Sequence, residues 1–252
     1  MQRILLIVFL MLSILSQIEG STRSDVKIVE ASENIRYLSQ KVAKEYLYLY
    51  YNPKKINLKN KLSENMRALE KNIYKIAINT QSDDSKNILT FLTYTNDEIK
   101  LLLKEEVTKD KSILILDYSE TFIEASTAIQ SLHQYDFSKE EKMLMQLKEI
   151  EYLLERVTKY YIASIMNLNK ISNTEQMQKT IEEIECTLQT IKTYPYPKKI
   201  KIEKEKILDS WKIHKKILTV SSKLSLPSLL SISIQNFKDN IKILELYHKK
   251  NQ

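Results

Sequence analysis

The sequence has 252 residues but only one glycine, four prolines and one cysteine. Glycine supplies the positive φ angles of tight turns and hairpins, so a β-rich fold of this length would normally contain many more glycines. Cys186 has no second cysteine with which to form an intrachain disulfide, so the fold must depend on packing. Straight-chain residues dominate the periodic segments and favour helix. We therefore expect an all-α protein.

Long apolar runs are also scarce. The one candidate, Ile4 to Leu15, is shorter than the roughly 20 apolar residues that cross a bilayer. It follows the basic Arg3 and precedes the small residue Gly20, which is the layout of a secretory signal peptide. We predict a cleaved signal peptide over residues 1–20 and a periplasmic or secreted mature chain. An uncleaved N-terminal membrane anchor is the lesser alternative.

The net charge of +7 is carried by lysines that are scattered rather than clustered. Most of them fit an ordinary solvated surface. For an exported protein, this basicity favours small anions, an acidic partner or the membrane surface, and we expect no nucleic-acid partner.

An internal repeat spans nearly the whole chain. Residues 35–56 and 150–171 align without a gap at an offset of 115, with nine identities in 22 positions. The same offset pairs Phe122 with Phe237 and His133 with His248. Because so long a gapless register is hard to reach by chance, we interpret it as a true duplication.

Each copy divides into four segments with apolar residues at helical spacing. The predicted helices are 26–51, 57–79, 85–107 and 109–134 in the first copy, and 139–167, 173–193, 198–221 and 226–249 in the second. Helices of this length with short connections pack as antiparallel neighbours. We therefore predict two tandem antiparallel four-helix bundles, eight helices in all, over 26–134 and 139–249.

Two serines carry a helix-start signal in the second copy. Ser138 with Glu141 and Ser172 with Glu175 fit the capping box, in which a hydroxyl and a carboxylate satisfy exposed backbone N–H groups. The two pairs predict helix starts directly after Ser138 and Ser172.

Signals for catalysis and metal binding are absent from the sequence. His133, His214 and His248 have no partner at metal-ligand spacing, and His133 and His248 fall at the ends of the fourth helices, where a cation suits the helix dipole. There is no glycine-rich phosphate loop and no legible pairing of a nucleophile with a base. We expect neither an enzyme nor a cofactor.

The stretch "SENIRYLSQKVAKEYL" at 32–47 resembles the first-helix motif of PilJ-type sensor domains, the N-terminal domains of type IV pili methyl-accepting chemotaxis transducers. The positions that match this motif directly are Arg36, Leu38, Ser39, Gln40, Ala43 and Lys44. NarX-type nitrate sensors carry a related stretch on a four-helix bundle. The resemblance implies a small-ligand site formed by Glu33, Asn34, Arg36, Ser39 and Gln40.

Two departures from the family pattern affect that site. Glu33 replaces the family's glycine and Tyr37 its methionine, and a carboxylate at position 33 would repel an anion such as nitrate. In the second copy, Glu151 stands where the first has Arg36. If the two copies pack as a pseudo-dimer, we expect Arg36 to face Glu151. A two-arginine anion clamp would then need a homodimer.

The family's receptors continue into a second transmembrane helix and a signalling module, and neither follows "HKKNQ" here. The resemblance thus implies an exported sensor that binds a small ligand, nitrate, nitrite or another small anion. Such a sensor signals through a separate membrane chemoreceptor or histidine kinase. The alternative is a structural or interaction module without a ligand, which docks on a receptor or a pilus-associated partner.

Overall fold

The computed structural model describes the backbone of residues 2–53, 56–133, 135–220 and 227–252 and their side chains, except those of residues 2–22, 56, 220, 227 and 228. Over these residues the chain is helical, with no strand. The helices are α1 (Gln2–Tyr51), α2 (Ile56–Asn79), α3 (Asp83–Leu102), α4 (Lys109–Leu132), α5 (Lys139–Ile165), α6 (Lys170–Thr193), α7 (Lys198–Val220) and α8 (Pro227–Lys250).

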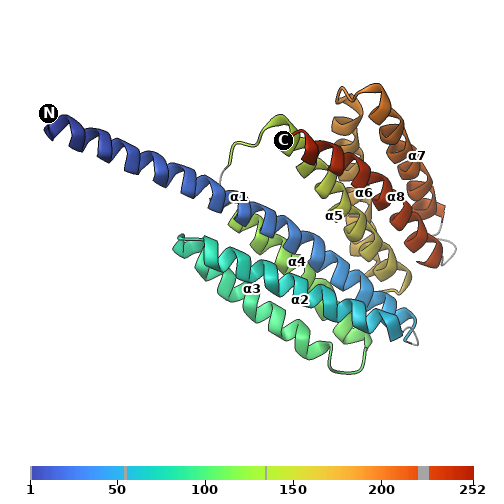
Figure 1. The fold of residues 1–252 in the computed structure, drawn as a ribbon. Helices are drawn as coiled ribbons and strands as arrows, with labels where there is room; N and C mark the ends of the chain where they lie inside the picture. Colours follow the sequence, from blue (N-terminus) through green and yellow to red (C-terminus); the bar gives the residue numbers. More distant parts are fainter. Residues whose placement is uncertain (1, 54–55, 134, 221–226) are drawn as a thin grey trace.

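The helices form two four-helix bundles, α1–α4 and α5–α8 (Figure 1). Each bundle encloses its own cluster of buried apolar side chains. Residues at equivalent positions of the two sequence copies occupy equivalent core positions and are completely buried: Ile35 and Ile150, Leu69 and Ile184, Phe122 and Phe237.

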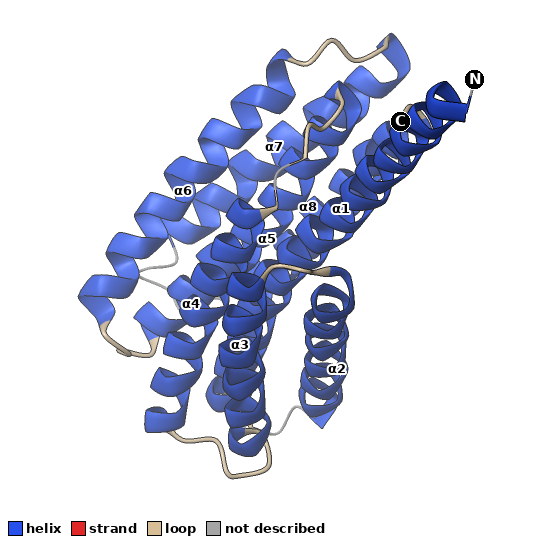
Figure 2. Ribbon diagram, turned by 90° about the vertical axis from the view of Figure 1, so that its left-hand side faces the viewer, coloured by secondary structure: helices blue, strands red, loops and turns tan. Residues whose placement is uncertain are grey.

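The bundles pack together through their first helices. α1 lies along α5 and runs in the same direction (Figure 1), and Figure 2 shows α6 on the opposite side of the second bundle from α1. Leu47 of α1 is completely buried in the core cluster of the second bundle, which also includes Leu116 of α4. The two bundles therefore pack against each other through buried apolar side chains.

Two predicted helix boundaries differ from the structure by five residues or more. The first helix begins at Gln2 rather than at residue 26, because neither proline nor a cluster of turn residues interrupts the chain after Gly20. Its first part projects beyond the bundle (Figure 1). The third helix ends at Leu102 instead of residue 107, since Leu103 and Val107 pack against the core from the connection that follows it.

One of the two predicted capping boxes is confirmed. Ser138 accepts a hydrogen bond from the Glu141 N–H at 3.2 Å, and the Glu141 carboxylate accepts one from the Ser138 N–H at 2.7 Å. The prediction at Ser172 is wrong, because α6 begins at Lys170 and Ser172 lies inside its first turn. Asn167 and Asn169 adopt left-handed backbone angles, with φ of 55° and 47°, and close the connection early.

The predicted signal peptide, residues 1–20, lies outside the side chains that the structure describes. Within the described part of the chain, no helix combines the length and apolar character needed to cross a membrane.

Candidate functional site

The Arg36 guanidinium, the centre of the site implied by the family resemblance, is held by carboxylates of the chain itself. Its Nη1 lies 3.0 Å from Glu33 Oε1 and 2.8 Å from Glu149 Oε2, and its Cζ lies 4.2 Å from the centre of the Tyr152 ring. Burial opposes the charge of Arg36, but Glu33 and Glu149 more than compensate and raise its pKa. The guanidinium of Arg36 is thus already paired with two carboxylates of the same chain, where an added anion would bind.

The prediction that Arg36 faces Glu151 is wrong, because its partner in the second copy is another glutamate. A carboxylate of the second copy does reach Arg36, but it comes from Glu149, two positions earlier in α5. Two positions correspond to about 200° of rotation around a helix, so Glu151 projects to a different side of α5. There it lines a cleft together with Lys238 and Lys242.

The other residues of the implied site make structural contacts. The Ser39 hydroxyl donates to the Arg36 carbonyl at 2.9 Å, and the Gln40 amide donates to the Ser119 carbonyl of α4 at 3.0 Å. Asn34 donates to Asn72 of α2 at 3.2 Å. Asn34, Gln40 and Arg36 therefore join α1 to its neighbours, whereas the Ser39 bond stays within α1.

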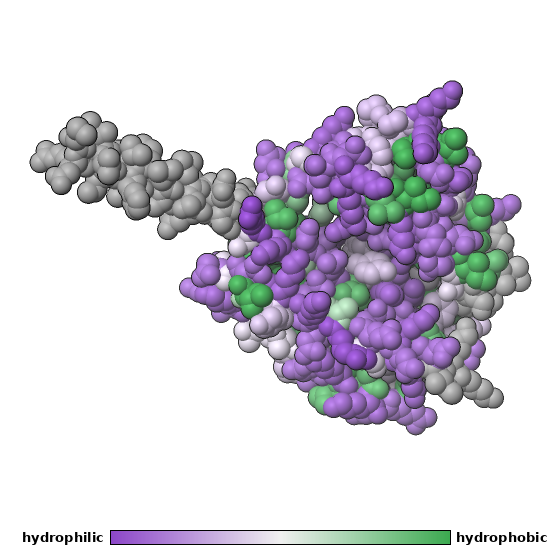
Figure 3. Space-filling view, in the orientation of Figure 1, coloured by the Kyte–Doolittle hydropathy of each residue, from purple (hydrophilic) through white to green (hydrophobic). Residues whose placement is uncertain are grey.

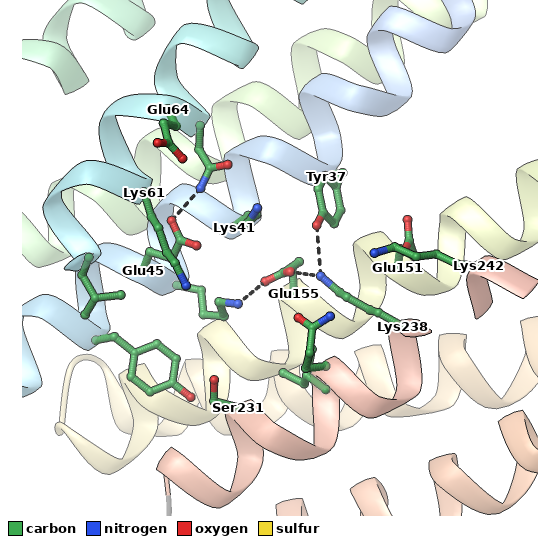
Figure 4. Close-up of a pocket in the computed structure, with 16 residues that line it drawn as sticks. Tyr37, Lys41, Glu45, Lys61, Glu64, Glu151, Glu155, Ser231, Lys238 and Lys242 are labelled. Carbon is green, nitrogen blue, oxygen red and sulfur yellow. Dashed lines mark hydrogen bonds and ion pairs between the residues drawn. The ribbon is translucent and has the colours of Figure 1, made fainter. Parts of the chain in front are cut away.

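A cleft of about 370 Å³ opens at the junction of the two bundles, close to this stretch of α1 (Figure 4). We call it the α1–α8 cleft. Its walls come from α1, α2, α5 and α8, and are formed by Tyr37, Lys41, Lys44, Glu45, Tyr48, Leu58, Lys61, Glu64, Asn65, Glu151, Glu155, Ser231, Ile234, Gln235, Lys238 and Lys242. Five lysines against four glutamates make the lining highly charged, with a slight positive excess.

The floor of the α1–α8 cleft is a buried ion network centred on Glu155. Lys44 Nζ of the first bundle lies 2.6 Å from Glu155 Oε2, and Lys238 of α8 pairs with the other carboxylate oxygen. Lys238 also donates to the Tyr37 hydroxyl at 3.0 Å. Although burial alone would raise it, these two ammonium groups lower the pKa of Glu155 to about 2. The carboxylate is therefore ionised and joins the two bundles.

Two lysines of the cleft lack a carboxylate partner. Within the part of the chain that the structure describes, neither Lys41 nor Lys61 lies within 4 Å of a carboxylate oxygen. Burial lowers the pKa of Lys41, whose ammonium is 5.8 Å from the centre of the Tyr37 ring. Figure 4 shows the Lys61 side chain directed into the cleft. These two amines are the groups best placed to bind an added anion.

The carboxyl groups of the cleft differ in their ionisation. Burial raises the pKa of Glu45, which accepts a hydrogen bond from Asn65 at 2.6 Å. Burial, followed by the nearby charge of Glu245, raises the pKa of Glu151 to about 7. Near neutral pH the cleft is therefore more positive than its formal charges indicate, because Glu151 is partly protonated.

His133 and His248 each hydrogen-bond side chains of other helices or connections in their own bundle. His133 Nδ1 is 2.8 Å from Asp25 Oδ1 and its Nε2 is 2.9 Å from Ser85 Oγ. His248 Nδ1 is 2.5 Å from Glu140 Oε2 and its Nε2 is 2.8 Å from the Tyr196 hydroxyl. Asp25 and Glu140 are related by the same offset of 115 as the histidines, so both bundles have the same clasp between their first and fourth helices.

His214 is completely buried and hydrogen-bonded to Ser233 at 3.1 Å, and burial lowers its pKa to about 4. No group of three or more His, Cys, Asp and Glu side chains in the described ranges is arranged to hold a metal ion.

Neither a scan of protein-family models nor searches of curated proteins and solved structures find a match to this chain. The similarity of residues 32–47 to the PilJ-type motif stays a prediction that rests on those residues alone.

The stretch of α1 that carries the family resemblance contributes residues to the α1–α8 cleft, but they are not the residues of the implied site. Tyr37, Lys41 and Lys44 line the cleft, whereas the five residues of the implied site do not. The contribution of α8 could not be read from the repeat, because the repeat does not tell which helix of one bundle faces the other. One sequence signal for this surface of the first helix was available. Both copies of the repeat carry a cation at two equivalent positions, Lys41 and Arg156, and Lys44 and Lys159.

Proposed function

We propose that this chain is a sensor-type helical-bundle protein that binds a small anion in the α1–α8 cleft. The observation that carries the proposal is the convergence of Lys41 and Lys61, both without a carboxylate partner among the described residues, on a cleft of about 370 Å³. A volume of a few hundred Å³ is within the range of small-ligand sites.

The position of the cleft suits a sensor. Its walls come from both bundles, so a bound anion contacts α1 and α2 on one side and α5 and α8 on the other. A ligand shifts a conformational equilibrium only as far as it binds one state better than another. An anion that contacts both bundles favours the arrangement in which they are close together. We propose that a separate membrane chemoreceptor or histidine kinase reads this arrangement, and that the chain is exported.

The alternative proposal is an interaction module without a small ligand. It is favoured by one observation, the internal neutralisation of Arg36 by Glu33 and Glu149. In that case the charged cleft receives an acidic segment of a partner protein, and small anions have no measurable effect on the chain.

A thermal-shift screen with nitrate, nitrite, phosphate and succinate separates the two proposals. A ligand at a hundredfold excess over its dissociation constant stabilises the folded chain by about 2.7 kcal/mol. We expect such stabilisation in the wild type and its loss in Lys61→Ala, while Lys71→Ala, on the exposed surface of the same helix, behaves like the wild type. Stabilisation by no anion, together with co-purification of a receptor ectodomain, would favour the interaction module.

A further inference from the structure

A second cleft of about 370 Å³ is also lined by residues of both bundles. We call it the α4–α6 cleft, because its walls come from α4, α5 and α6. Its lining residues are Ile113, Leu116, Asp117, Glu120, Glu124, Arg156, Lys159, Tyr160, Asn169, Ser172, Asn173 and Gln176.

The two clefts are counterparts under the internal duplication. Each has walls from the first two helices of one bundle and the fourth helix of the other: α1, α2 and α8 in the first cleft, and α5, α6 and α4 in the second. The first cleft is also lined by Glu151 and Glu155 of α5, whose equivalents do not line the second. The offset of 115 relates lining residues of one cleft to lining residues of the other: Lys41 to Arg156, Lys44 to Lys159, Glu45 to Tyr160, Leu58 to Asn173, Lys61 to Gln176, and Glu120 to Gln235.

Both clefts thus keep a pair of cations one helical turn apart on the first helix of a bundle. The cations of the α4–α6 cleft are Arg156 and Lys159, and both are engaged by Glu120. Arg156 Nη2 lies 3.2 Å from Glu120 Oε2, while the completely buried Lys159 pairs with the other carboxylate oxygen and donates to Ser119 Oγ at 3.0 Å. Burial opposes ionisation of Glu120, but the charges of Lys159 and Arg156 lower its pKa.

The α1–α8 cleft has no carboxylate at the position equivalent to Glu120. Gln235 stands there, and it is exposed and donates a hydrogen bond to Asp239 on its own helix at 2.9 Å. The equivalent of Arg156 in this cleft is Lys41, one of the two amines without a carboxylate partner among the described residues. The difference between the clefts at this position is therefore one carboxylate.

We propose that the α4–α6 cleft is the internally closed counterpart of the α1–α8 cleft, and that the Glu120 carboxylate occupies the place that a ligand's carboxylate takes beside Lys41. This inference rests on the proposed function and specifies its ligand class, a small organic acid. It also assigns a role to two equivalent residues. Gln235 leaves the first cleft open to an acid, and Glu120 closes the second.

Exchange of the two residues tests the inference, with succinate as the probe in isothermal titration calorimetry of the full chain. We expect wild type to bind one succinate, and Glu120→Gln to bind two. Glutamine keeps the size of the side chain and one acceptor for the buried Lys159. Gln235→Glu adds a carboxylate to the wall of the cleft that Lys41 also lines. It should weaken succinate binding about tenfold or more, because the new carboxylate repels that of the ligand.

Glu124→Gln is the matched control for the second cleft. Glu124 is exposed, lies one turn along α4 from Glu120 and lines the same cleft, but forms no ion pair with a described residue. It should bind one succinate, like the wild type. A second binding event in Glu124→Gln would show that general loss of negative charge, and not release of the cation pair, opens the cleft, and would overturn the inference.

The outcomes separate the inference from the proposed function. One succinate in both wild type and Glu120→Gln overturns the inference and leaves the proposed function standing. No succinate in wild type but one in Glu120→Gln overturns the proposed function and supports the closure of the second cleft. Binding of nitrate without succinate overturns the organic-acid class. If Glu120→Gln does not fold, the Gln235→Glu variant tests the inference, because Gln235 is exposed and its substitution should leave the fold intact. A succinate affinity of this variant equal to that of the wild type would contradict the inference.

Discussion

At the scale of single residues, the charged side chains of this protein are of two kinds: those paired with an opposite charge and those without such a partner among the described residues. The Arg36 side chain is 15% exposed and pairs with two carboxylates, whereas the cleft lysines Lys41 and Lys61 have no carboxylate partner among the described residues. A buried ion pair is costly to break from one side, because the remaining charge loses its partner. Mutations at these two kinds of position should therefore have different consequences.

Substitution of Arg36 by alanine should destabilise the protein without affecting anion binding. Glu33 and Glu149 would lose their shared cation, and we expect a loss of about 1–3 kcal/mol in the free energy of unfolding, reduced from the fully buried case because Arg36 and Glu149 are partly exposed. Urea unfolding measures the loss, and the exposed Arg67→Ala is the control. Abolished anion binding at unchanged stability would instead restore the site implied by the family resemblance.

Glu151 should make stability depend on pH around neutrality. Its pKa is raised from 4.5 to about 7 in the folded protein, so the folded state binds a proton that the unfolded state has already lost. This contribution is complete below about pH 4.5 and disappears as the pH rises through 7. Glu151→Gln should therefore match the wild type near pH 5 and exceed its stability by up to about 2 kcal/mol at pH 8.

Chemical denaturation at pH 5, 6, 7 and 8 tests this difference in slope, with the exposed Glu175→Gln as a control for removing a carboxylate. Parallel pH profiles for wild type and Glu151→Gln would contradict the assigned role of Glu151.

At the scale of helices, each bundle is closed at one end by a histidine that joins its first and fourth helices. His133 bonds Asp25 on α1 and Ser85 on α3, and His248 bonds Glu140 on α5 and Tyr196 in the connection before α7. The tyrosine ring also packs against the imidazole of His248, with ring centres 5.4 Å apart.

Removal of one clasp should loosen only the end of its own bundle. His248→Ala leaves the Tyr196 hydroxyl without its partner and Glu140 with the Tyr194 hydroxyl only, which we expect to cost about 1–3 kcal/mol. Amide hydrogen exchange should accelerate at the start of α5 and the end of α8 and stay unchanged at the His133 clasp. The exposed Lys250→Ala serves as the control. Unchanged exchange at α5 and α8 would show that the clasp contributes nothing to this end.

The sequence predicts the helices better than their ends, and the ends better than the site. Stripes such as Ile35, Leu38 and Val42 specify a helix and its buried side, because periodicity follows directly from helix geometry. The break at Ser172 was misplaced because Asn167 and Asn169 adopt left-handed angles that the capping pattern does not contain. The clefts depend on how two bundles are rotated against each other, and no local pattern encodes that rotation.

At the scale of the whole molecule, the two bundles behave as one packed unit with charged clefts at their junction. The face shown in Figure 3 is largely hydrophilic, with separated apolar patches. The contact between the bundles is apolar where Leu47 enters the second core and ionic where Lys44 meets Glu155. Stability should therefore be shared across the junction.

Leu47→Ala tests this sharing, because the only tryptophan, Trp211, lies in the second bundle and reports on it alone. Leu47 belongs to α1, yet its truncation should shift the unfolding transition of Trp211 fluorescence and cost about 2–4 kcal/mol. Circular dichroism, which reports on both bundles, should give the same midpoint. Leu114→Ala, at an exposed position, is the control. A fluorescence transition that stays in place would contradict the coupling.

The most direct test of the central claim is calorimetric titration of a small anion into the wild type and into the double variant Lys41→Gln/Lys61→Gln. Both substitutions remove cleft charges that have no carboxylate partner among the described residues, so the fold should be retained. We predict saturable binding of succinate to the wild type, its loss in the double variant, and unchanged binding in the exposed control Lys71→Gln. Equal binding by the wild type and the double variant would contradict the assignment of the α1–α8 cleft as the ligand site.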